Sequence, residues 1–562
     1  MTSFRNVSAI LAAAFLMATA TAVVWGQDAV SVPRNDAAGN GEVARLVAVL
    51  QSDAAPFEKA KACQHLARIG NKEAVPALAA LLADERLSTY ARFGLEPIAD
   101  PSVDAAFRAA LETLHGDRLI GVIHSVGFRR DRDAVPALTR LAADPAPEIA
   151  SRALAALGEI ATPEAVETLE QSLAGDVATV RAAAADACLV GGERLLAQGK
   201  RDEAVRLYDA VRRADAPQEA RVAATRGAIL AREIGGVPLL LEQLKTGDEA
   251  MIDMALRVSR ELPGSDVTTS LVAELDRLPP ELQVRLICAI GDRQDAAALP
   301  AMRQRAAGGP EEVRSAAMYV LGQLGDASAV PILLEAALSG ESALGQTAQE
   351  SLKKLPGSAV DEAILAKLEQ ADPETRVVLL GLVGRLAITG AMPAVLRAAD
   401  APEEPVRLAA IAALGRIIGL KELAILTDRL LQARSPQETA AAEEALKIAI
   451  PRMPDPDACV GILSERLPNA PVASKCFVIE LIGSIGGEPA LAVVAAAAGD
   501  YNEDLQDAAT RALGTWKDAT AAPELLKLAK TLPTEKFRVR TLRGYLRIAQ
   551  QMKLSDEQKL AM

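Results

Sequence analysis

Apolar and polar positions follow the period of an α-helix along most of the chain. In the clearest stretch, from Glu311, apolar residues stand at positions 313, 316, 317, 320, 321 and 324. This spacing predicts a helix with one buried face. Gly325 is expected to supply a left-handed turn at its end, and Asp326 and Ser328 to cap the next segment. That segment, Val330 to Leu338, is apolar-striped as well, so the predicted unit is helix, tight turn, helix.

The same unit recurs along the chain. With Val330 as a register mark, equivalent positions mostly lie about 28 to 32 residues apart. The marks are Val75, Val103, Val135, Val166, Val237, Val267, Leu299, Val330, Val360, Met392, Leu423, Cys459, Leu491 and Ala522. The step from Val166 to Val237 spans about two periods, so residues 187–236 are predicted to hold an aberrant copy. Its Ala204 and Tyr208 resemble half of a tetratricopeptide hairpin. Because one unit cannot bury its apolar faces alone, the copies are expected to stack.

Three recurring motifs resemble the short HEAT repeats, a kind also found in phycobilin lyases. They are an opening Val-Arg-x-Ala-Ala at Val313, a closing Ala-Leu-Gly-x-Ile at Ala413 and a restart Ala-Val-Pro-x-Leu at Ala134. The resemblance implies an all-α fold, an α-α superhelix of the HEAT/ARM-like solenoid type with about fourteen to fifteen helical hairpins. It covers nearly all of residues 42–562, which are expected to form one continuous solenoid. These motifs consist of core and turn residues, so they say little about function.

The first residues differ from the rest. Arg5 is the only charged residue before Asp28, and Val7 to Val24 are mostly apolar. This pattern predicts a signal peptide over residues 1–26, cleaved after Gly26, and a flexible lead-in over residues 27–41. The protein would then be extracytoplasmic, periplasmic or secreted, as in bacteria, with no membrane span in the mature chain. The alternative is an uncleaved N-terminal anchor, since roughly twenty uncharged residues could span a bilayer.

Charge narrows the class of partner. The chain carries 61 basic and 74 acidic residues, a formal net charge of −13. A nucleic-acid-binding domain is normally basic, so we expect no nucleic-acid partner. Six arginines stand near the starts of first helices, and we expect them to link neighbouring repeats through carboxylates such as Asp292 and Asp326. They are Arg181, Arg221, Arg285, Arg314, Arg376 and Arg407.

Candidate chemistry is sparse. The only histidines are His65, His115 and His124, and no metal-binding or nucleophile motif accompanies them. The five cysteines are predicted to be buried thiols, and Cys459 with Cys476 is the one pairing to test. We therefore expect no catalytic residue, no metal and no cofactor.

One basic segment is the best binding candidate. Residues 525–562 are predicted to form a basic C-terminal cap. Four basic side chains there recur at helical spacing, while Leu542, Tyr545, Leu546 and Ala549 are expected to face the preceding repeat. The four are Lys536, Arg540, Arg543 and Arg547. The alternative is a solvated face on a capping helix. Tyr319, on an outward column three residues before the helix glycine, is a second candidate.

The sequence therefore favours an exported, non-catalytic scaffold that binds a protein partner on an extended surface, with Tyr319 and the basic stripe as anchors. Two alternatives stay open. One is an enzyme or ligand carrier similar to phycobilin lyases, and the other is an assembly factor or chaperone for exported proteins.

Overall fold

The computed structural model describes residues 36–339 and 342–551, and within these two stretches every regular element is helical. Taken two at a time, the helices from α3 (Pro56–Ile69) to α32 (Ala522–Thr531) give fifteen hairpins. Helix α2 (Asp36–Gln51) precedes them and α33 (Glu535–Gln551) comes after them. The predicted fold class, an all-α solenoid of about fourteen to fifteen hairpins, is confirmed.

The chain divides into two compact units, Met1–Val258 and Ser259–Met562, and the boundary lies inside α15 (Glu249–Glu261). The other helices of the first unit are α4 (Val75–Ala79), α5 (Ser88–Leu95), α6 (Pro101–Leu111), α7 (Gly116–Arg129), α8 (Val135–Ala142), α9 (Pro147–Ile160), α10 (Pro163–Ser172), α11 (Ala178–Ala197), α12 (Arg201–Arg213), α13 (Gln218–Arg232) and α14 (Val237–Gln243). The prediction of one continuous solenoid over residues 42–562 concerns both units together and stays a prediction.

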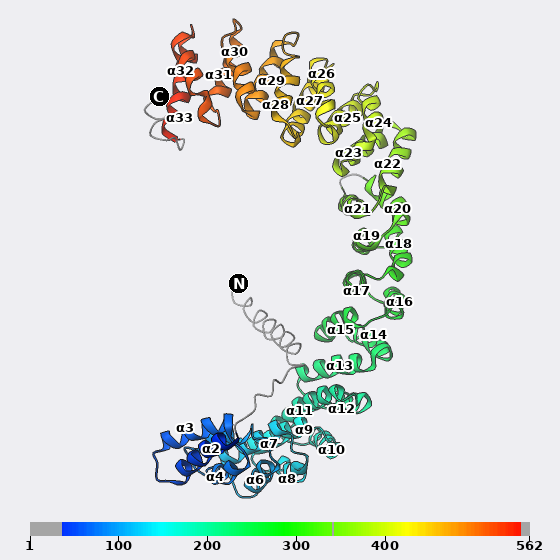
Figure 1. The fold of residues 1–562 in the computed structure, drawn as a ribbon. Coiled ribbons are helices and arrows are strands. Elements are labelled where there is room, and N and C mark those ends of the chain that lie inside the picture. Colours follow the sequence, from blue (N-terminus) through cyan, green and yellow to red (C-terminus); the bar gives the residue numbers. More distant parts are fainter. Residues whose placement is uncertain (1–35, 340–341, 552–562) are drawn as a thin grey trace. The chain divides into compact units, whose positions relative to one another are not determined.

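The second unit repeats the same arrangement. Its further helices are α16 (Ser265–Glu274), α17 (Pro280–Asp292), α18 (Leu299–Ala307), α19 (Glu311–Leu324), α20 (Val330–Ala337), α21 (Ala343–Lys354), α22 (Ala359–Gln370), α23 (Pro373–Leu386), α24 (Met392–Ala398), α25 (Glu404–Ile417), α26 (Leu423–Leu431), α27 (Pro436–Ala449), α28 (Pro456–Ser464), α29 (Val472–Ile485), α30 (Glu488–Ala498) and α31 (Glu503–Gly514). First helices such as α17, α19 and α21 stand in one row, and second helices such as α16, α18 and α20 stand in another (Figure 1).

The N-terminal predictions fall mostly outside the described residues. The expected signal peptide, residues 1–26, lies there, and so does most of the expected lead-in, residues 27–41. Because α2 begins at Asp36, the end of that lead-in is helical and not an irregular segment. Over residues 36–339 and 342–551, no helix combines the length and apolar character that crossing a bilayer requires.

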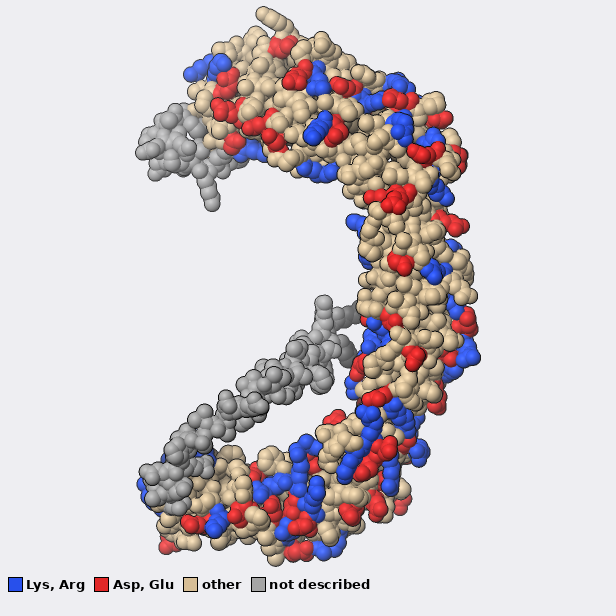
Figure 2. Space-filling view, turned by 45° about the vertical axis from the view of Figure 1, so that its right-hand side comes forward, with Lys and Arg blue, Asp and Glu red and all other residues tan. Residues whose placement is uncertain are grey.

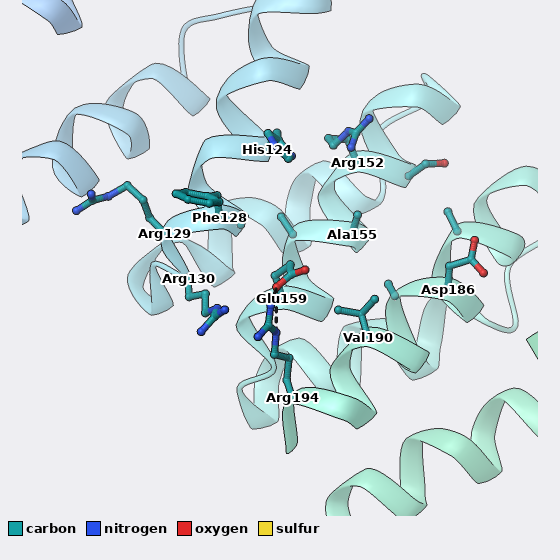
Figure 3. Close-up of a pocket in the computed structure, with 15 residues that line it drawn as sticks. His124, Phe128, Arg129, Arg130, Arg152, Ala155, Glu159, Asp186, Val190 and Arg194 are labelled. Atoms are coloured by element: carbon teal, nitrogen blue, oxygen red, sulfur yellow. Dashed lines mark hydrogen bonds and ion pairs between the residues drawn. The ribbon is translucent and has the colours of Figure 1, made fainter. Parts of the chain in front are cut away.

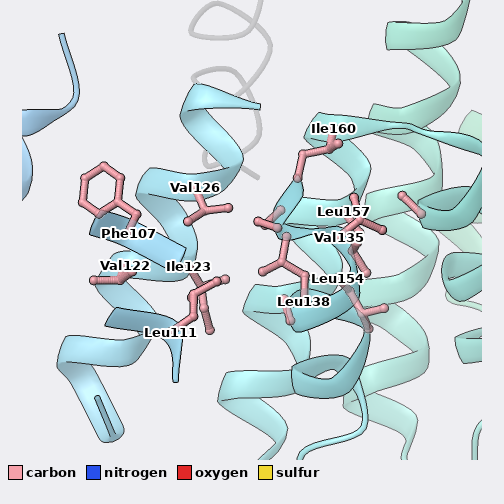
Figure 4. Close-up of a cluster of buried hydrophobic side chains, with 14 of the residues drawn as sticks. Phe107, Leu111, Val122, Ile123, Val126, Val135, Leu138, Leu154, Leu157 and Ile160 are labelled. Atoms are coloured by element: carbon pink, nitrogen blue, oxygen red, sulfur yellow. The ribbon is translucent and has the colours of Figure 1, made fainter. Parts of the chain in front are cut away.

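Buried side chains join each hairpin to the next. In the first unit, apolar residues of α6 and α7 form one layer of the core, and those of α8 and α9 form the adjoining layer (Figure 4). These residues are Phe107, Leu111, Val122, Ile123, Val126, Val135, Leu138, Leu154, Leu157 and Ile160. A fully buried side chain of this size contributes roughly 1.5–3 kcal/mol. The faces predicted from the apolar spacing are therefore the faces that hold neighbouring repeats together.

A short 3₁₀ turn connects the two helices of many hairpins. Between α19 and α20, the carboxylate of Asp326 accepts a hydrogen bond from the N–H of Ser328 at 2.9 Å, which confirms the expected cap. The expected left-handed Gly325 is wrong, because its φ is −70° and its ψ is 160°. A Cβ at this glycine would lie 2.1 Å from the carbonyl oxygen of Leu321. The turn thus requires the absence of a side chain and not a positive φ. Equivalent caps are Asn71, Asp131, Asp295 and Asp518.

Residues 187–236 fill the long step in the register. Here α11 is 20 residues long and α12 comes next after Gly199, which has a φ of 76°. Ala204 and Tyr208 are both buried on α12. The Tyr208 ring lies where a Cβ on Gly192 of α11 or on Gly227 of α13 would stand, within 2.6 to 2.7 Å of ring atoms. Small residues on both neighbours therefore admit the aromatic ring.

Candidate binding site

The basic stripe of α33 faces its neighbour α31 more than the sequence suggests. Phe537, Thr541, Tyr545 and Ile548 are the buried side chains of this helix. Leu542 and Leu546, which were expected to pack on the preceding repeat, are 43% and 46% exposed, so that prediction is wrong. The cause is the rotation of the helix, which tertiary packing sets and which apolar spacing alone leaves open. This rotation turns part of the basic stripe toward the preceding repeat.

Three of the predicted binding residues line one groove in the second unit. We call it the C-terminal groove, and it has a volume of about 710 Å³. Its lining comes from α29, from α31 with the turn after it, and from α33: Glu480, Gly483, Ser484, Arg511, Ala512, Gly514, Thr515, Lys517, Arg540, Arg543, Gly544 and Arg547. Its glycines permit close helix packing, since a Cβ on Gly544 would lie 3.0 Å from the Cα of Gly514. The groove has a floor of small residues and a basic rim.

Asp507 neutralises part of this basic charge. Its carboxylate Oδ1 lies 2.7 Å from the Lys536 Nζ and 3.1 Å from an Arg540 guanidinium nitrogen. Arg511 pairs with Glu480 at 2.9 Å and reaches Asp507 at 3.4 Å. The hydrogen bond from Lys536, with further help from Arg540 and Arg511, lowers the pKa of Asp507 below its ordinary value although burial opposes this. Lys536 and Arg540 are thus held by the protein itself.

The remaining basic residues of the groove face no carboxylate among the described residues. Arg547 donates to the carbonyl oxygens of Gly514 at 3.1 Å and Trp516 at 2.6 Å. Lys517 donates to the carbonyl oxygen of Ser484 at 2.8 Å. The side chain of Arg543 is exposed and makes no hydrogen bond or ion pair with any other described residue. These side chains keep their full positive charge, because a carbonyl oxygen orients a cation without neutralising it.

Tyr319 lies apart from this groove. It stands on α19 with 46% of its surface exposed, and the Nζ of Lys354 lies 4.7 Å from the centre of its ring. This is the distance of a cation–π contact. The contact holds the ring against α21, and its role as a binding anchor stays a prediction.

The arginines near the starts of first helices link repeats in two ways. Arg181 and Arg407 pair with carboxylates of the next repeat, Asp215 and Glu438, as expected, whereas Arg314 and Arg376 bond carbonyl oxygens. Arg314 donates to Ala306 at 3.1 Å and Arg376 to Ala371 at 2.8 Å, in each case near the end of the preceding second helix. The two carboxylates that the sequence suggested as partners of these arginines bond other groups. Asp292 pairs with Arg260 at 2.7 Å, and Asp326 caps Ser328.

Side chains that could carry chemistry lie scattered over the described residues. His65, His115 and His124 are exposed; His65 lies on α3, His115 is the N-cap of α7 and His124 lies more than two turns further along α7. Within residues 36–339 and 342–551, no group of three His, Cys, Asp or Glu side chains is placed to hold a metal ion. All five cysteines are free thiols, Cys459 and Cys476 included.

A second groove, in the first unit, was not foreseen. We call it the Arg130 groove, and its volume is about 680 Å³. Residues of α7, with the residue after it, and of α9 and α11 line this groove (Figure 3). They are His124, Gly127, Phe128, Arg129, Arg130, Ser151, Arg152, Ala155, Ala156, Glu159, Ala183, Asp186, Ala187, Val190 and Arg194. Ala155 belongs to the outward column three residues before the helix glycine, and His124 occupies this column one repeat earlier. This column is the feature of the sequence that could have predicted the groove, but the residues in it share little chemistry.

Charge elsewhere on the surface is mixed. On the face shown in Figure 2, basic and acidic side chains lie interspersed over the helices of both units. Several ion pairs join neighbouring repeats, such as Arg181 with Asp215 at 2.9 Å and Arg194 with Glu159 at 2.6 Å. Exposed pairs of this kind contribute about 0–1 kcal/mol each. Arginines without a carboxylate partner among the described residues also lie elsewhere, such as Arg132 and Arg538, so the two grooves are distinguished by having such arginines at the edge of a hollow.

Stacked helical hairpins with grooves along their first helices define a helical-repeat protein. A model of HEAT repeats matches residues 105–188, 268–353 and 362–447. The chain therefore contains HEAT repeats over these residues, as the motifs predicted. No curated protein matches the sequence.

Solved structures similar to this chain include two karyopherins. Kap95p, described with RanGDP, shares 13% identity at a TM-score of 0.36 and covers 90% of this chain and 88% of its own. Kap121p bound to the SUMO protease Ulp1p shares 12% identity at a TM-score of 0.36, over 92% of this chain and 74% of its own. Human deoxyhypusine hydroxylase shares 23% identity at a TM-score of 0.21, and the match covers 45% of this chain and 96% of the hydroxylase chain. Scores this low carry no functional argument.

Proposed function

We propose that this protein is an exported, non-catalytic scaffold whose C-terminal groove receives an acidic segment of a protein partner. The observation that carries the proposal is the uncompensated basic charge of this groove on a chain with a net charge of −13. The HEAT-repeat fold supports it, because stacked hairpins present a long surface with little enclosed volume.

The charges of the groove favour a carboxylate-bearing ligand. Three basic side chains, Lys517, Arg543 and Arg547, face no carboxylate in the part of the chain that the structure describes. An arginine binds a carboxylate through two parallel hydrogen bonds, which a lysine cannot do. A ligand that brings acidic side chains would replace the water on these groups with charge-assisted hydrogen bonds.

The groove is also organised before a ligand arrives. Arg547 is fixed by two backbone carbonyls and Lys517 by one. A side chain that is already ordered loses less conformational entropy on binding. Arg543 is the residue whose charge a partner can engage without breaking a contact with another described residue of the fold.

The export part of the proposal rests on residues 1–26, whose sequence has the features of a signal peptide. Native protein isolated from the extracytoplasmic fraction should begin at Gln27 by N-terminal sequencing. An intact N-terminus would instead favour the anchored form.

The test uses charge reversal at a position that the fold does not need. The wild-type protein, Arg543→Glu and Arg538→Glu are immobilised, and proteins of the extracytoplasmic fraction of the source cell are captured on each. Arg538 is a matched control, because it is exposed on the same helix and lies outside the groove. A partner held by the wild type and Arg538→Glu but lost from Arg543→Glu is the expected result.

Other outcomes favour other functions. If the wild type and both variants retain the partner, the C-terminal groove is not the site that binds it. If only a small or coloured molecule is recovered, the phycobilin-lyase-like enzyme or carrier becomes the better hypothesis. A partner that is captured only in an unfolded form would indicate the chaperone or assembly factor.

A further inference from the structure

The Arg130 groove lies in the first unit and is separate in sequence from the C-terminal groove. Its floor is formed by alanines of α9 and α11, and its edges carry arginines and one phenylalanine (Figure 3). The helices that form the floor pack closely. A Cβ on Gly127 would lie 2.9 Å from the Cα of Ala156, and a Cβ on Gly158 would lie 2.5 Å from the carbonyl oxygen of Ala187.

Two of its four arginines are engaged by the fold. Arg129 pairs with Asp104 at 2.5 Å and donates to the carbonyl oxygens of Glu96 and Ile98 at 2.7 and 2.9 Å. Arg194 pairs with Glu159 at 2.6 Å. These side chains build the wall of the groove and leave little charge for a ligand.

The other two arginines are available. The side chains of Arg130 and Arg152 make no hydrogen bond or ion pair with another residue of the described chain. Arg130 is at the end of α7, where its φ is 57°. Ala161 and Ala387 adopt the same conformation at equivalent helix ends, so the turn does not need an arginine. Figure 3 shows the two guanidinium groups at different edges of the groove.

An apolar surface lies beside these charges. Phe128 is 62% exposed, and Figure 3 shows its ring next to Arg130 and His124 at the edge of the groove. Arginines and aromatic rings are the residues that most often dominate protein interfaces. The floor of alanines offers further apolar contact for a narrow ligand.

We infer that the Arg130 groove binds an extended peptide segment of a partner protein in which two acidic side chains flank an apolar one. The two carboxylates pair with Arg130 and Arg152, and the apolar side chain between them lies over Ala155 and against Phe128. This site is additional to the C-terminal groove and does not depend on it.

The carboxylates of the groove argue for a peptide over a nucleic-acid strand. Glu159 and Asp186 both line the groove, and Asp186 has no ion-pair partner among the described residues. A continuous row of phosphates would be repelled by Asp186. A peptide places its two negative charges apart and can turn a backbone N–H toward that carboxylate.

The test measures binding of a fluorescein-labelled pentapeptide, Gly-Glu-Leu-Glu-Gly, to the full-length protein by anisotropy at low salt. The variants are Arg130→Gln, Arg152→Gln and, as a matched control two residues away, Arg132→Gln, which lies outside the groove. Each groove variant is expected to weaken binding about tenfold, since each removes one charge-assisted contact. Arg132→Gln is expected to bind as the wild type does. Arg543→Glu is measured separately, because it reports any binding of the peptide at the C-terminal groove.

Three results would overturn the inference. The peptide with Gln in place of both Glu residues could bind equally well, Arg130→Gln and Arg152→Gln could have no effect, or Arg543→Glu alone could abolish binding. Circular dichroism of each variant, unchanged from the wild type, ensures that a loss reflects the site. Because the C-terminal groove is tested by Arg543→Glu, failure of the proposed function and failure of this inference give different patterns.

Discussion

Single arginines in this chain differ in whether the fold satisfies them. Arg407 is the extreme case, because its Nε lies 2.5 Å from Glu438 and the two side chains are only 10% and 5% exposed. Arg407 also donates to the carbonyl oxygens of Ala401 and Pro402 at 2.9 and 2.6 Å. Arg130 and Arg543 stand at the other extreme. Substitution of Arg130 or Arg543 should therefore change the free energy of unfolding little, whereas substitution of Arg407 breaks a buried ion pair.

Removing Arg407 alone should be strongly destabilising. Arg407→Met leaves the Glu438 carboxylate buried without its cation, which typically costs about 3–5 kcal/mol. The double variant Arg407→Met with Glu438→Leu should recover most of this loss, because it buries no charge. Urea unfolding followed by circular dichroism measures both. A loss of under about 1 kcal/mol for Arg407→Met would show that the carboxylate escapes to water.

This loss should depend on pH. Burial raises the pKa of Glu438, but hydrogen bonds from the Arg434 N–H and from Arg407 lower it by more, so that the net pKa lies below the ordinary value of a glutamate. A lowered folded-state pKa means stability that is present above the unfolded pKa and is lost as pH falls through the folded one. The stability gap between the wild type and Arg407→Met should therefore narrow below about pH 4.5. A gap that does not change down to pH 3 would contradict this account.

The cysteines should behave as inert thiols. Burial raises the pKa of Cys63 to about 11 and that of Cys188 to about 12, so neither forms appreciable thiolate at pH 8. Iodoacetamide should label Cys288 and Cys476, which are partly exposed, well before Cys63 and Cys188. Mass spectrometry of the unreduced, denatured protein should count five free thiols. A peptide linking Cys459 to Cys476 would refute this.

At the scale of helices and turns, glycines decide how closely repeats approach. Gly415 of α25 faces α27, where a Cβ would lie 2.6 Å from the Cα of Ala445 and 2.8 Å from its carbonyl oxygen. Gly461 lies within α28 and has no atom within 4 Å of the place a Cβ would take. Both are helical glycines in one unit, so they differ mainly in what surrounds them.

Alanine at these two glycines should have opposite effects. Gly415→Ala meets backbone atoms that cannot move aside and should destabilise by about 1–3 kcal/mol. Gly461→Ala should stabilise by about 0.5–1 kcal/mol, because alanine loses less backbone entropy in a helix. Urea midpoints of the two variants and the wild type measure this. If both variants are stabilised, helix propensity and not helix packing dominates.

The sequence predicts the elements of this protein better than their orientation. Helix α19 and the Asp326 cap arise from local spacing and local hydrogen bonding, and both are present. The prediction of a positive φ at Gly325 is wrong, because the position requires glycine for another reason: a Cβ there would collide with the carbonyl oxygen of Leu321. The exposure of Leu542 depends on how α33 rotates against its neighbours, which periodicity does not fix. The Arg130 groove needs three helices brought together, so only its column of outward residues was visible in the sequence.

At the scale of the whole chain, stability is a sum of contacts between neighbours. The core shown in Figure 4 joins α6, α7, α8 and α9, and such local layers recur from repeat to repeat. The division into units at Val258 is a further reason to expect several partly independent transitions. In repeat proteins, cooperativity breaks down when interfaces between repeats are weak relative to chain length.

Unfolding should therefore not be two-state. The chain has two tryptophans, Trp25 and Trp516, and Trp516 is 1% exposed on the turn after α31. In a Trp25→Phe variant, fluorescence reports only the repeats around Trp516, while circular dichroism reports all helices. The two urea transitions should have different midpoints, and the circular dichroism transition should be broader, because distant repeats unfold at different urea concentrations. Coincident curves with a steep slope would mean that repeats on both sides of Val258 unfold together, because the interfaces between neighbouring repeats are strong enough to couple them.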